Sequence, residues 1–280
     1  IGRFKVSRRL GAGGMGLVFE AHDQDLDRKV AVKLLRTDGS GSNSDEASTR
    51  LLREAQALAR VSHPNVISVY EVGTYRGQVF VAMEFIDGET LDVWQRDPEL
   101  QWPEILSVYL DAARGLAAAH DAGLVHRDFK PANVMRSRDG RVVVLDFGLA
   151  RHTDTEAFDE ALTRVQAAGS SSAVLRDRVR AQRSGTYKLG DHLATPLTAT
   201  GAVMGTPAYM SPEALAGGSM GVGRPGDDLW AMGVVAYELL TSVRPFGEGS
   251  FEEVMAMQLA GPPPPPSSVL CSCSSDTKIM

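Results

Sequence analysis

The sequence has 280 residues, a formal net charge of −6 at pH 7 and two cysteines. The acidic balance gives no electrostatic reason to expect nucleic acid or an anionic membrane surface as a partner. No apolar run reaches the roughly 20 residues that cross a bilayer, and Cys271 and Cys273 are too few for a disulfide framework or a complete zinc site. The length is sufficient for two lobes with a cleft between them.

The chain begins at Ile1, with neither an initiator Met nor a signal peptide. Together with the scarcity of cysteine, this beginning predicts a reducing, cytoplasmic setting for a fragment or processed product of a longer protein. The cytosolic domain of a longer membrane-anchored protein would satisfy the same observations.

Glycines near the N-terminus form the first motif, Gly-x-Gly-x-x-Gly at Gly11, Gly13 and Gly16. Glycine lets the backbone approach phosphate groups closely and present its N–H groups to them. A dinucleotide-binding fold is the obvious rival, but it needs a helix directly after the glycines. Residues 17–21 and 30–33 have the composition of strands instead, so the residues from about 1 to 36 are predicted to carry three strands around a glycine-rich turn.

Each of the next two predicted elements carries one charged residue of interest. Lys33 alternates with apolar neighbours, as an ordinary solvated strand residue also would. Glu54 lies in a predicted helix at residues 50–58, beside its apolar stripe rather than opposite it. Glu46 competes with Glu54 as the carboxylate of interest, but it precedes that helix and is interpreted as a partner of the helix dipole.

Further along the chain, strands give way to helices. The Asp139-Gly140 pair is favourable for a two-residue hairpin turn. The other predicted elements are a flexible connector at 38–44, strands at 66–70 and 78–84, a crossing segment at 83–88, a helix at 102–120, and an apolar helix at 228–240 that Asp228 would cap.

The most informative stretch is residues 126–133, His-Arg-Asp-Phe-Lys-Pro-Ala-Asn, with Asp-Phe-Gly following at 146–148. It supplies a carboxylate at Asp128, an ammonium at Lys130 and a carboxamide at Asn133, and the second motif adds a carboxylate at Asp146. Phosphoryl transfer needs such a set, because a group must orient the attacking hydroxyl, a cation must stand near the moving phosphate, and oxygen ligands must hold Mg²⁺.

With these motifs the sequence resembles the protein kinase family over residues 2–260. The particular residues of the motifs resemble those of the bacterial eukaryotic-like serine/threonine kinases. The resemblance implies an α+β, bilobal protein-kinase-like fold. It predicts a β-rich N-lobe at 1–84, a mostly helical C-lobe at 85–261 and a Pro/Ser-rich tail at 262–280.

The resemblance also assigns roles to the residues of the two motifs. Asp128 would accept or orient the proton of the substrate hydroxyl, and Lys130 would neutralise charge on the transferring phosphoryl group. Asn133 and Asp146 would chelate Mg²⁺, with Mn²⁺ as an alternative metal. His126 is expected to support the backbone of this loop rather than to react.

Residues that bind ATP follow from the same resemblance. Lys33 would contact the α- and β-phosphates and pair with Glu54. Met83 would guard the back of the adenine pocket, and the backbone of Glu84 and Ile86 would bind the adenine edge, although a plain connector would have similar residues. The whole predicted set is Gly11, Ala12, Gly13, Gly14, Gly16, Val18, Ala31, Lys33, Glu54, Met83, Glu84, Ile86, Asn133 and Asp146.

Two features favour protein substrates with serine or threonine acceptors. Lys130 follows Asp128 by two residues, where tyrosine kinases usually differ. Residues 205–213 look like the segment that docks protein substrates, with Thr206 positioned to bond both side chains and with Ser-Pro-Glu in place of the usual Ala-Pro-Glu. Small-molecule kinases of related fold lack this segment.

The segment between Asp146 and residue 213 is longer than is usual in the family, with the excess at about residues 153–193. We interpret the excess as a mobile regulatory insert, with a simple tolerated insertion as the alternative. Thr198 and Thr200 stand where the bacterial relatives autophosphorylate, and an arginine such as Arg127 is typical of kinases that need this phosphate. Two solvated loop threonines are the other interpretation.

The C-terminal end is the second departure from the family. A predicted helix at 251–260 is followed by five prolines at 262–266, which are expected to block further helix. Family members continue with two more helices and an arginine that pairs with the glutamate matching Glu213, whereas no arginine follows Arg244. The C-lobe is therefore predicted to be truncated, with Glu213 partly buried and without its cation.

The sequence thus predicts an enzyme that transfers the γ-phosphoryl group of Mg-ATP to serine and threonine hydroxyls of proteins. Autophosphorylation at Thr198 and Thr200 would activate it, with a homodimer serving for transfer in trans. An ATP-binding but inactive truncated domain, acting as a scaffold or regulator, is the runner-up. A small-molecule phosphotransferase ranks third.

Overall fold

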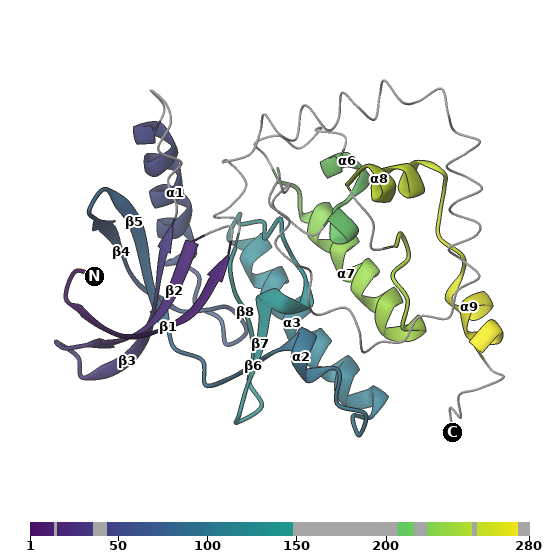
Figure 1. The fold of residues 1–280 in the computed structure, drawn as a ribbon, viewed down its shortest axis with the longest axis horizontal. Coiled ribbons are helices and arrows are strands. Elements are labelled where there is room, and N and C mark those ends of the chain that lie inside the picture. The colour runs from purple at the N-terminus through teal and green to yellow at the C-terminus, as the bar shows by residue number, and fades with distance from the viewer. Residues whose placement is uncertain (14–15, 36–43, 148–206, 216–222, 248–250, 274–280) are drawn as a thin grey trace. The chain divides into compact units, whose positions relative to one another are not determined.

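The computed structural model describes residues 1–13, 16–35, 44–147, 207–215, 223–247 and 251–273 (Figure 1). The chain divides into two compact units, Ile1–Thr153 and Asp154–Met280, and each is described by itself. The predicted division into lobes at residues 84 and 85 and a tail from residue 262 stays a prediction.

A five-stranded antiparallel sheet opens the first unit, with the strand order β1-β2-β3-β5-β4. The central strands β3 and β5 are rich in valine and are buried along nearly their whole length, as expected for strands covered on both faces. The strands are β1 (Phe4–Gly13), β2 (Gly16–Asp23), β3 (Arg28–Leu35), β4 (Val69–Tyr75) and β5 (Gln78–Glu84). The three predicted strands around the glycines are thus confirmed.

Helix α1 (Ser44–Leu58) lies against β4 and β5. Leu51, Ala55 and Leu58 recur at helical spacing and are all buried, so they form the face that packs on the sheet. The prediction that this helix begins at residue 50 was wrong, because the polar run before it already starts the helix. Residue 46 therefore lies within the helix and not before it.

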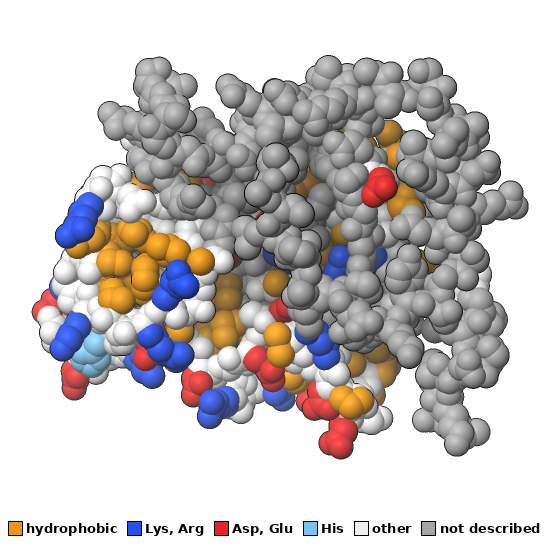
Figure 2. Space-filling view, viewed as in Figure 1, with side chains coloured by type: hydrophobic (Ala, Val, Ile, Leu, Met, Phe, Trp, Pro, Cys, Tyr) orange, Lys and Arg blue, Asp and Glu red, His pale blue; other side chains and the backbone are white. Residues whose placement is uncertain are grey.

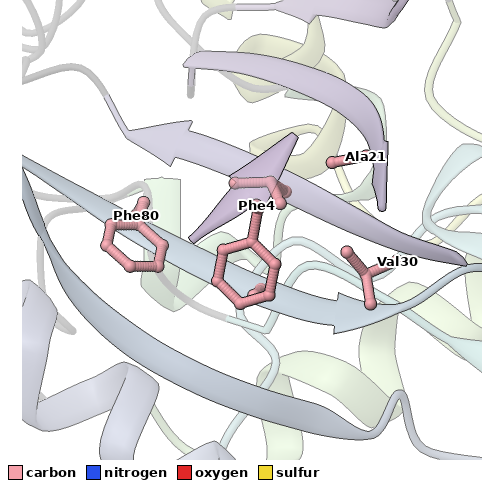
Figure 3. Close-up of a cluster of buried hydrophobic side chains, with 6 residues drawn as sticks. Phe4, Ala21, Val30 and Phe80 are labelled. Atoms are coloured by element: carbon pink, nitrogen blue, oxygen red, sulfur yellow. The ribbon is translucent and has the colours of Figure 1, made fainter. Parts of the chain in front are cut away.

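A compact apolar cluster binds the strands of this sheet together (Figure 3). The Phe4 and Phe80 rings meet edge to face, with centroids 6.1 Å apart and an interplanar angle of 71°. Because Phe4 comes from β1 and Phe80 from β5, the contact joins strands that are not neighbours in the sheet. The cluster consists of Phe4, Ala21, Val30, Val32, Phe80 and Ala82.

The rest of the first unit combines helices α2 (Leu91–Trp94) and α3 (Trp102–Asp121) with a small sheet of strand order β6-β7-β8. The predicted helix at 102–120 is confirmed, and Val108, Ala112 and Leu116, which recur at helical spacing, form its buried face. The predicted hairpin is confirmed, but its turn is longer than the two residues expected, because residues 138–141 lie between β7 and β8, with Gly140 at φ 90°. The strands are β6 (Gly88–Thr90), β7 (Val134–Ser137) and β8 (Val142–Val144).

Strand β8 is held beside the segment that follows α1. The Val144 N–H donates to Asn65 O at 2.9 Å, and the Ile67 N–H donates to Val144 O at 3.1 Å. Gly115 of α3 lies so close that an added Cβ would be 2.4 Å from Asn65 O. The predicted strand at 66–70 is therefore only partly correct, since residues 66 and 67 bond to β8 and the regular strand begins at Val69.

The described part of the second unit is helical, and α7 (Pro225–Thr241) is its longest helix. The prediction that this helix begins at Asp228 was wrong, because it begins three residues earlier, at Pro225. Pro225 takes the first position, where its missing N–H costs nothing, and Asp227 Oδ2 accepts the Arg224 N–H at 3.0 Å. The other described elements are η2 (Pro207–Tyr209), α6 (Pro212–Leu215), α8 (Phe251–Leu259) and α9 (Pro266–Cys273).

Helix α9 contradicts the prediction that the five prolines block further helix. Pro266 is the first residue of α9, a position that tolerates proline, so the proline run precedes the helix instead of preventing it. The run is also held to α7, because the Tyr237 hydroxyl donates to Pro264 O at 2.9 Å.

Glu213 also departs from its prediction, since its side chain is exposed and needs no buried cation. A partly buried carboxylate with side-chain partners in this unit is Glu238 of α7. It accepts the Tyr209 hydroxyl at 2.8 Å and pairs with the Arg244 guanidinium at 3.3 Å. Burial, reinforced by the negative charge of Glu238, raises the pKa of Tyr209 above its ordinary value, so the hydroxyl remains a donor.

Among the described helices, none is long and apolar enough to cross a membrane.

We expect Phe80→Ala to lower the free energy of unfolding by about 3–5 kcal/mol, because it empties the centre of the cluster that joins β1 to β5. Val6→Ala on β1 is the control, since Val6 is 40% exposed, and we expect it to cost less than about 0.5 kcal/mol. Urea unfolding followed by circular dichroism measures both variants. Equal losses for the two would show that the cluster does not stabilise the sheet.

Candidate active site

The loop between α3 and β7 is built around a buried imidazole. His126 is fully buried, and its Nε2 lies 2.7 Å from Leu145 O while its Nδ1 lies 3.3 Å from the Asp128 N–H. These partners fit the tautomer that carries the proton on Nε2, because Nδ1 must accept. The ring also packs on Phe129 and Phe147, with centroids 5.8 and 4.8 Å away. His126 therefore supports backbone, as expected, and joins residue 128 to the segment after β8.

Two residues beside this imidazole have positive φ angles, which residues other than glycine rarely adopt. Arg127 has φ 66° and Asp146 has φ 54°. Such angles cost on the order of 1–3 kcal/mol each and persist only where the surroundings fix them. The hydrogen bonds and ring contacts of His126 provide that fixation, so the loop presents Asp128 and Asp146 in set orientations.

Asp128, Lys130 and Asn133 form a hydrogen-bonded cluster. Lys130 Nζ donates to Asp128 Oδ2 at 2.9 Å, and Asn133 Nδ2 donates to the same oxygen at 3.0 Å and to Asp128 O at 2.7 Å. Asn133 is held in place because its own carbonyl accepts the Leu145 N–H at 2.8 Å. The structure thus brings together the carboxylate, ammonium and carboxamide that the sequence placed at intervals of two and three residues.

Lys33 joins the five-stranded sheet to Asp146, two residues after β8. Its Nζ lies 2.8 Å from Asp146 Oδ1, and its side chain is only 3% exposed. An ammonium removed from water to this degree requires a close anion, and Asp146 supplies it.

Glu54 of α1 lies within reach of the loop between α3 and β7. Its Oε1 is 3.4 Å from Arg127 Nη1, and both side chains are largely buried. The pair between Glu54 and Lys33 stays a prediction. Ion pairs do join Glu54 to Arg127 and Lys33 to Asp146.

Several residues that were predicted to bind the nucleotide lie close together in the five-stranded sheet. Val18 is opposite Lys33, and Lys33 is opposite Val81; Ala31 is opposite Met83. Side chains alternate along a strand, so Ala31, Lys33 and Met83 share a face.

The glycine-rich turn is described at both ends. Gly11 is paired with Val18, Ala12 with Leu17, and Gly13 with Gly16 across the β1–β2 hairpin. Gly16 has φ 136°, and an added Cβ would lie 2.0 Å from Leu34 O, so no other residue fits there.

Several predicted residues lie outside the described part of the chain. They are Gly14, the insertion at 153–193, Thr198, Thr200 and Thr206.

One feature of the site was missed from the sequence. Glu84 was assigned a role through its backbone alone, but its carboxylate binds the Arg141 guanidinium through both oxygens, at 2.5 and 2.8 Å. The hydrogen bond to Glu84 raises the pKa of Arg141 above its ordinary value. The residues are far apart in sequence, and no motif contains Arg141, so no local signal marked it.

The donor set suits a metal that is shared with phosphate groups. Asn133 uses its Nδ2 on Asp128, which leaves its Oδ1 as an oxygen ligand, and Asp146 adds a carboxylate. Within the described residues there is no group of three or more His, Cys, Asp or Glu side chains that would hold a metal by itself. Mg²⁺ is commonly bound by one or two side-chain oxygens together with substrate phosphates and water, so these residues fit that mode.

Comparison with known proteins agrees with this geometry. Residues 4–169 match the family model described as protein kinase domain. The serine/threonine-protein kinase PknJ of Mycobacterium tuberculosis is 35% identical over 270 residues, covering 94% of this chain and 38% of that protein. PknA of the same species, also named a serine/threonine-protein kinase, is 34% identical over 269 residues, covering 94% of this chain and 52% of that protein.

The chain thus spans about half or less of the length of these relatives. Among solved structures, the PknI kinase domain of Mycobacterium tuberculosis aligns with a TM-score of 0.59 and 24% identity, covering 89% of this chain and 78% of that one. At this identity the likeness concerns the fold.

Proposed function

The chain belongs to the protein kinase family, and we propose that it transfers the γ-phosphoryl group of ATP to serine and threonine hydroxyls of protein substrates. The observation that carries this proposal is the cluster of Asp128, Lys130 and Asn133, beside the pair of Lys33 with Asp146. The relatives named serine/threonine-protein kinases support the substrate class. An inactive scaffold is not favoured, because every residue of the set is present.

Asp128 is suited to receive the proton of the attacking hydroxyl. Among described residues, the donors to its side chain, Lys130 and Asn133, both bond to Oδ2, so Oδ1 is left to accept from a substrate. As the hydroxyl oxygen bonds to the γ-phosphorus and the bond to the ADP oxygen breaks, the proton passes to this carboxylate. Lys130 stands within 2.9 Å of Asp128 and places a cation beside the moving phosphoryl group.

Lys33 and the glycine-rich turn would hold the phosphates of ATP, with adenine on the face of Ala31 and Met83 and its edge at the backbone of Glu84 and Ile86. Asn133 and Asp146 would ligate Mg²⁺ or Mn²⁺, which supplies positive charge to offset the phosphates.

Proteins with serine or threonine acceptors are the proposed partners, docked by the segment that includes Thr206. A second copy of the chain is the proposed partner for autophosphorylation in trans. A cytoplasmic location would give access to ATP.

Regulation by phosphate at Thr198 or Thr200 belongs to the same proposal. Arg127 supports it, because a phosphate would offset the positive charge of this guanidinium, whose Nη1 lies 3.4 Å from Glu54 Oε1. A phosphothreonine carries about −1.5 to −2 charges and three acceptor oxygens, more than a carboxylate offers. Such a phosphate would therefore compete with Glu54 for Arg127.

Asp128→Asn should lower phosphotransfer by roughly 10²–10⁴-fold, because an amide cannot take the proton, while affinity for Mg-ATP stays close to that of the parent. Asp27→Asn is a matched control: Asp27 is 96% exposed, and asparagine tolerates its φ of 47°. Transfer of labelled phosphate from ATP to myelin basic protein measures both variants. Unchanged transfer by Asp128→Asn would refute the assignment of the base.

Incubation with Mg-ATP should place phosphate on Thr198, Thr200 or both, which phosphopeptide mapping detects. The double variant Thr198→Ala/Thr200→Ala should lose most of the activity that the parent gains on this incubation. As a control, Ser268→Ala in α9 removes an exposed hydroxyl that donates to Pro265 O, just before the helix. This variant should gain as much activity on incubation as the parent does. Full activation of the double variant would contradict the regulatory claim.

A further inference from the structure

The carboxylate of Glu84 is held by an arginine that no motif includes. Arg141 Nη1 and Nη2 donate to the two oxygens of Glu84 at 2.5 and 2.8 Å, and Arg141 Nε donates to Pro64 O at 2.8 Å. Three donors of one guanidinium are thus used in a single plane, and the two side chains are only 33% and 22% exposed. Bidentate pairs of this kind restrict geometry more than a single contact does.

This arginine connects two parts of the site that lie on different segments. Glu84 ends β5 and begins the connector at 84–88, whose backbone would receive the adenine edge. Arg141 stands at the start of β8, in the hairpin that begins just after Asn133 and leads on to Asp146. The hairpin fixes Arg141 itself, because Arg141 O accepts the Ser137 N–H at 2.8 Å.

The far end of the connector is bound to the same hairpin. The Arg138 N–H donates to Asp87 O at 2.9 Å, and β6, which begins at Gly88, pairs with β7. An added Cβ at Gly88 would lie 2.1 Å from Arg136 O, so the strands approach as closely as glycine allows. The side-chain pair of Arg138 with Asp87 is 81% and 66% exposed, and such pairs contribute little. Arg141 is therefore the side chain that fixes the near end.

We infer that Arg141 is a positioning residue for the nucleotide. The Glu84 N–H already donates to Ser68 O at 2.9 Å. By clamping the Glu84 side chain, Arg141 sets the direction of the Glu84 C=O and the Ile86 N–H toward the adenine edge. It also holds that edge in register with the hairpin that carries the oxygen ligands for the metal. The inference rests on the proposed function, since it concerns the same nucleotide site.

The test separates nucleotide affinity from catalysis. In Arg141→Gln we expect the dissociation constant for ATP and the KM for ATP to rise about tenfold, while kcat stays within about twofold. Arg141→Lys keeps the charge but loses the planar fork, so it should fall between Arg141→Gln and the parent. Glu84→Gln should resemble Arg141→Gln. Arg138→Gln, which removes the exposed pair on the same connector, should change neither constant by more than about twofold.

Rescue and direct binding keep the outcomes distinct. The reversed pair Glu84→Arg/Arg141→Glu should recover part of the lost affinity, which a general loss of stability would not do. ATP binding by calorimetry is measured without catalysis, so a parent that binds ATP but transfers no phosphate refutes the proposed function and leaves this inference supported if Arg141→Gln weakens binding. Unchanged affinity in folded Arg141→Gln, a parent without affinity for ATP, or a rise of kcat above the parent overturns the inference.

Discussion

The buried ammonium of Lys33 is the constraint on which the arrangement of the site depends. An almost fully buried cation is stable only beside an anion in good geometry, and Asp146 at 2.8 Å provides it. Lys33 itself cannot move far, because β3 pairs on both sides, with β2 and β5. The pair therefore fixes Asp146, two residues after β8, with respect to the five-stranded sheet. Because desolvation of the two groups offsets much of their attraction, the ion pair specifies geometry more than it adds stability.

The same segment is fixed from its other side by neutral contacts. His126 reaches Leu145 O, Asn133 O accepts the Leu145 N–H, and the ring of Phe147 packs on the imidazole. These contacts hold the backbone of Asp146 at a positive φ that it would not adopt alone. An unstrained loop would direct the two carboxylates of the site elsewhere. The strain is therefore compensated by apolar packing and backbone hydrogen bonds, which do not change when charges in the site change.

What could be predicted from the sequence was what is local in it. The residues of the 126–133 motif come together because they lie within one loop, and the Asp139-Gly140 turn and the apolar faces of α1 and α3 follow from short-range pattern. The pairs of Arg127 with Glu54 and Arg141 with Glu84 join residues far apart in sequence, and no pattern in a single chain links them. The errors have the same origin. Helix α9 follows a run of prolines, where helix propensity alone predicts no helix. The exposure of Glu213 depends on its tertiary surroundings.

The four charges of Lys33, Glu54, Arg127 and Asp146 can be paired in more than one way. In the structure Asp146 lies beside Lys33, and Glu54 lies beside Arg127. A shift of Glu54 toward Lys33 would increase the demand for an anion at Arg127 and for a cation at Asp146. The proposed phosphothreonine and the proposed metal have these charges. Because both would favour the same shift of Glu54, each partner should favour the binding of the other by the same factor. Under the proposed function, phosphate at Thr198 or Thr200 would then raise the affinity for Mg-ATP, and Mg-ATP would stabilise the position of that phosphate.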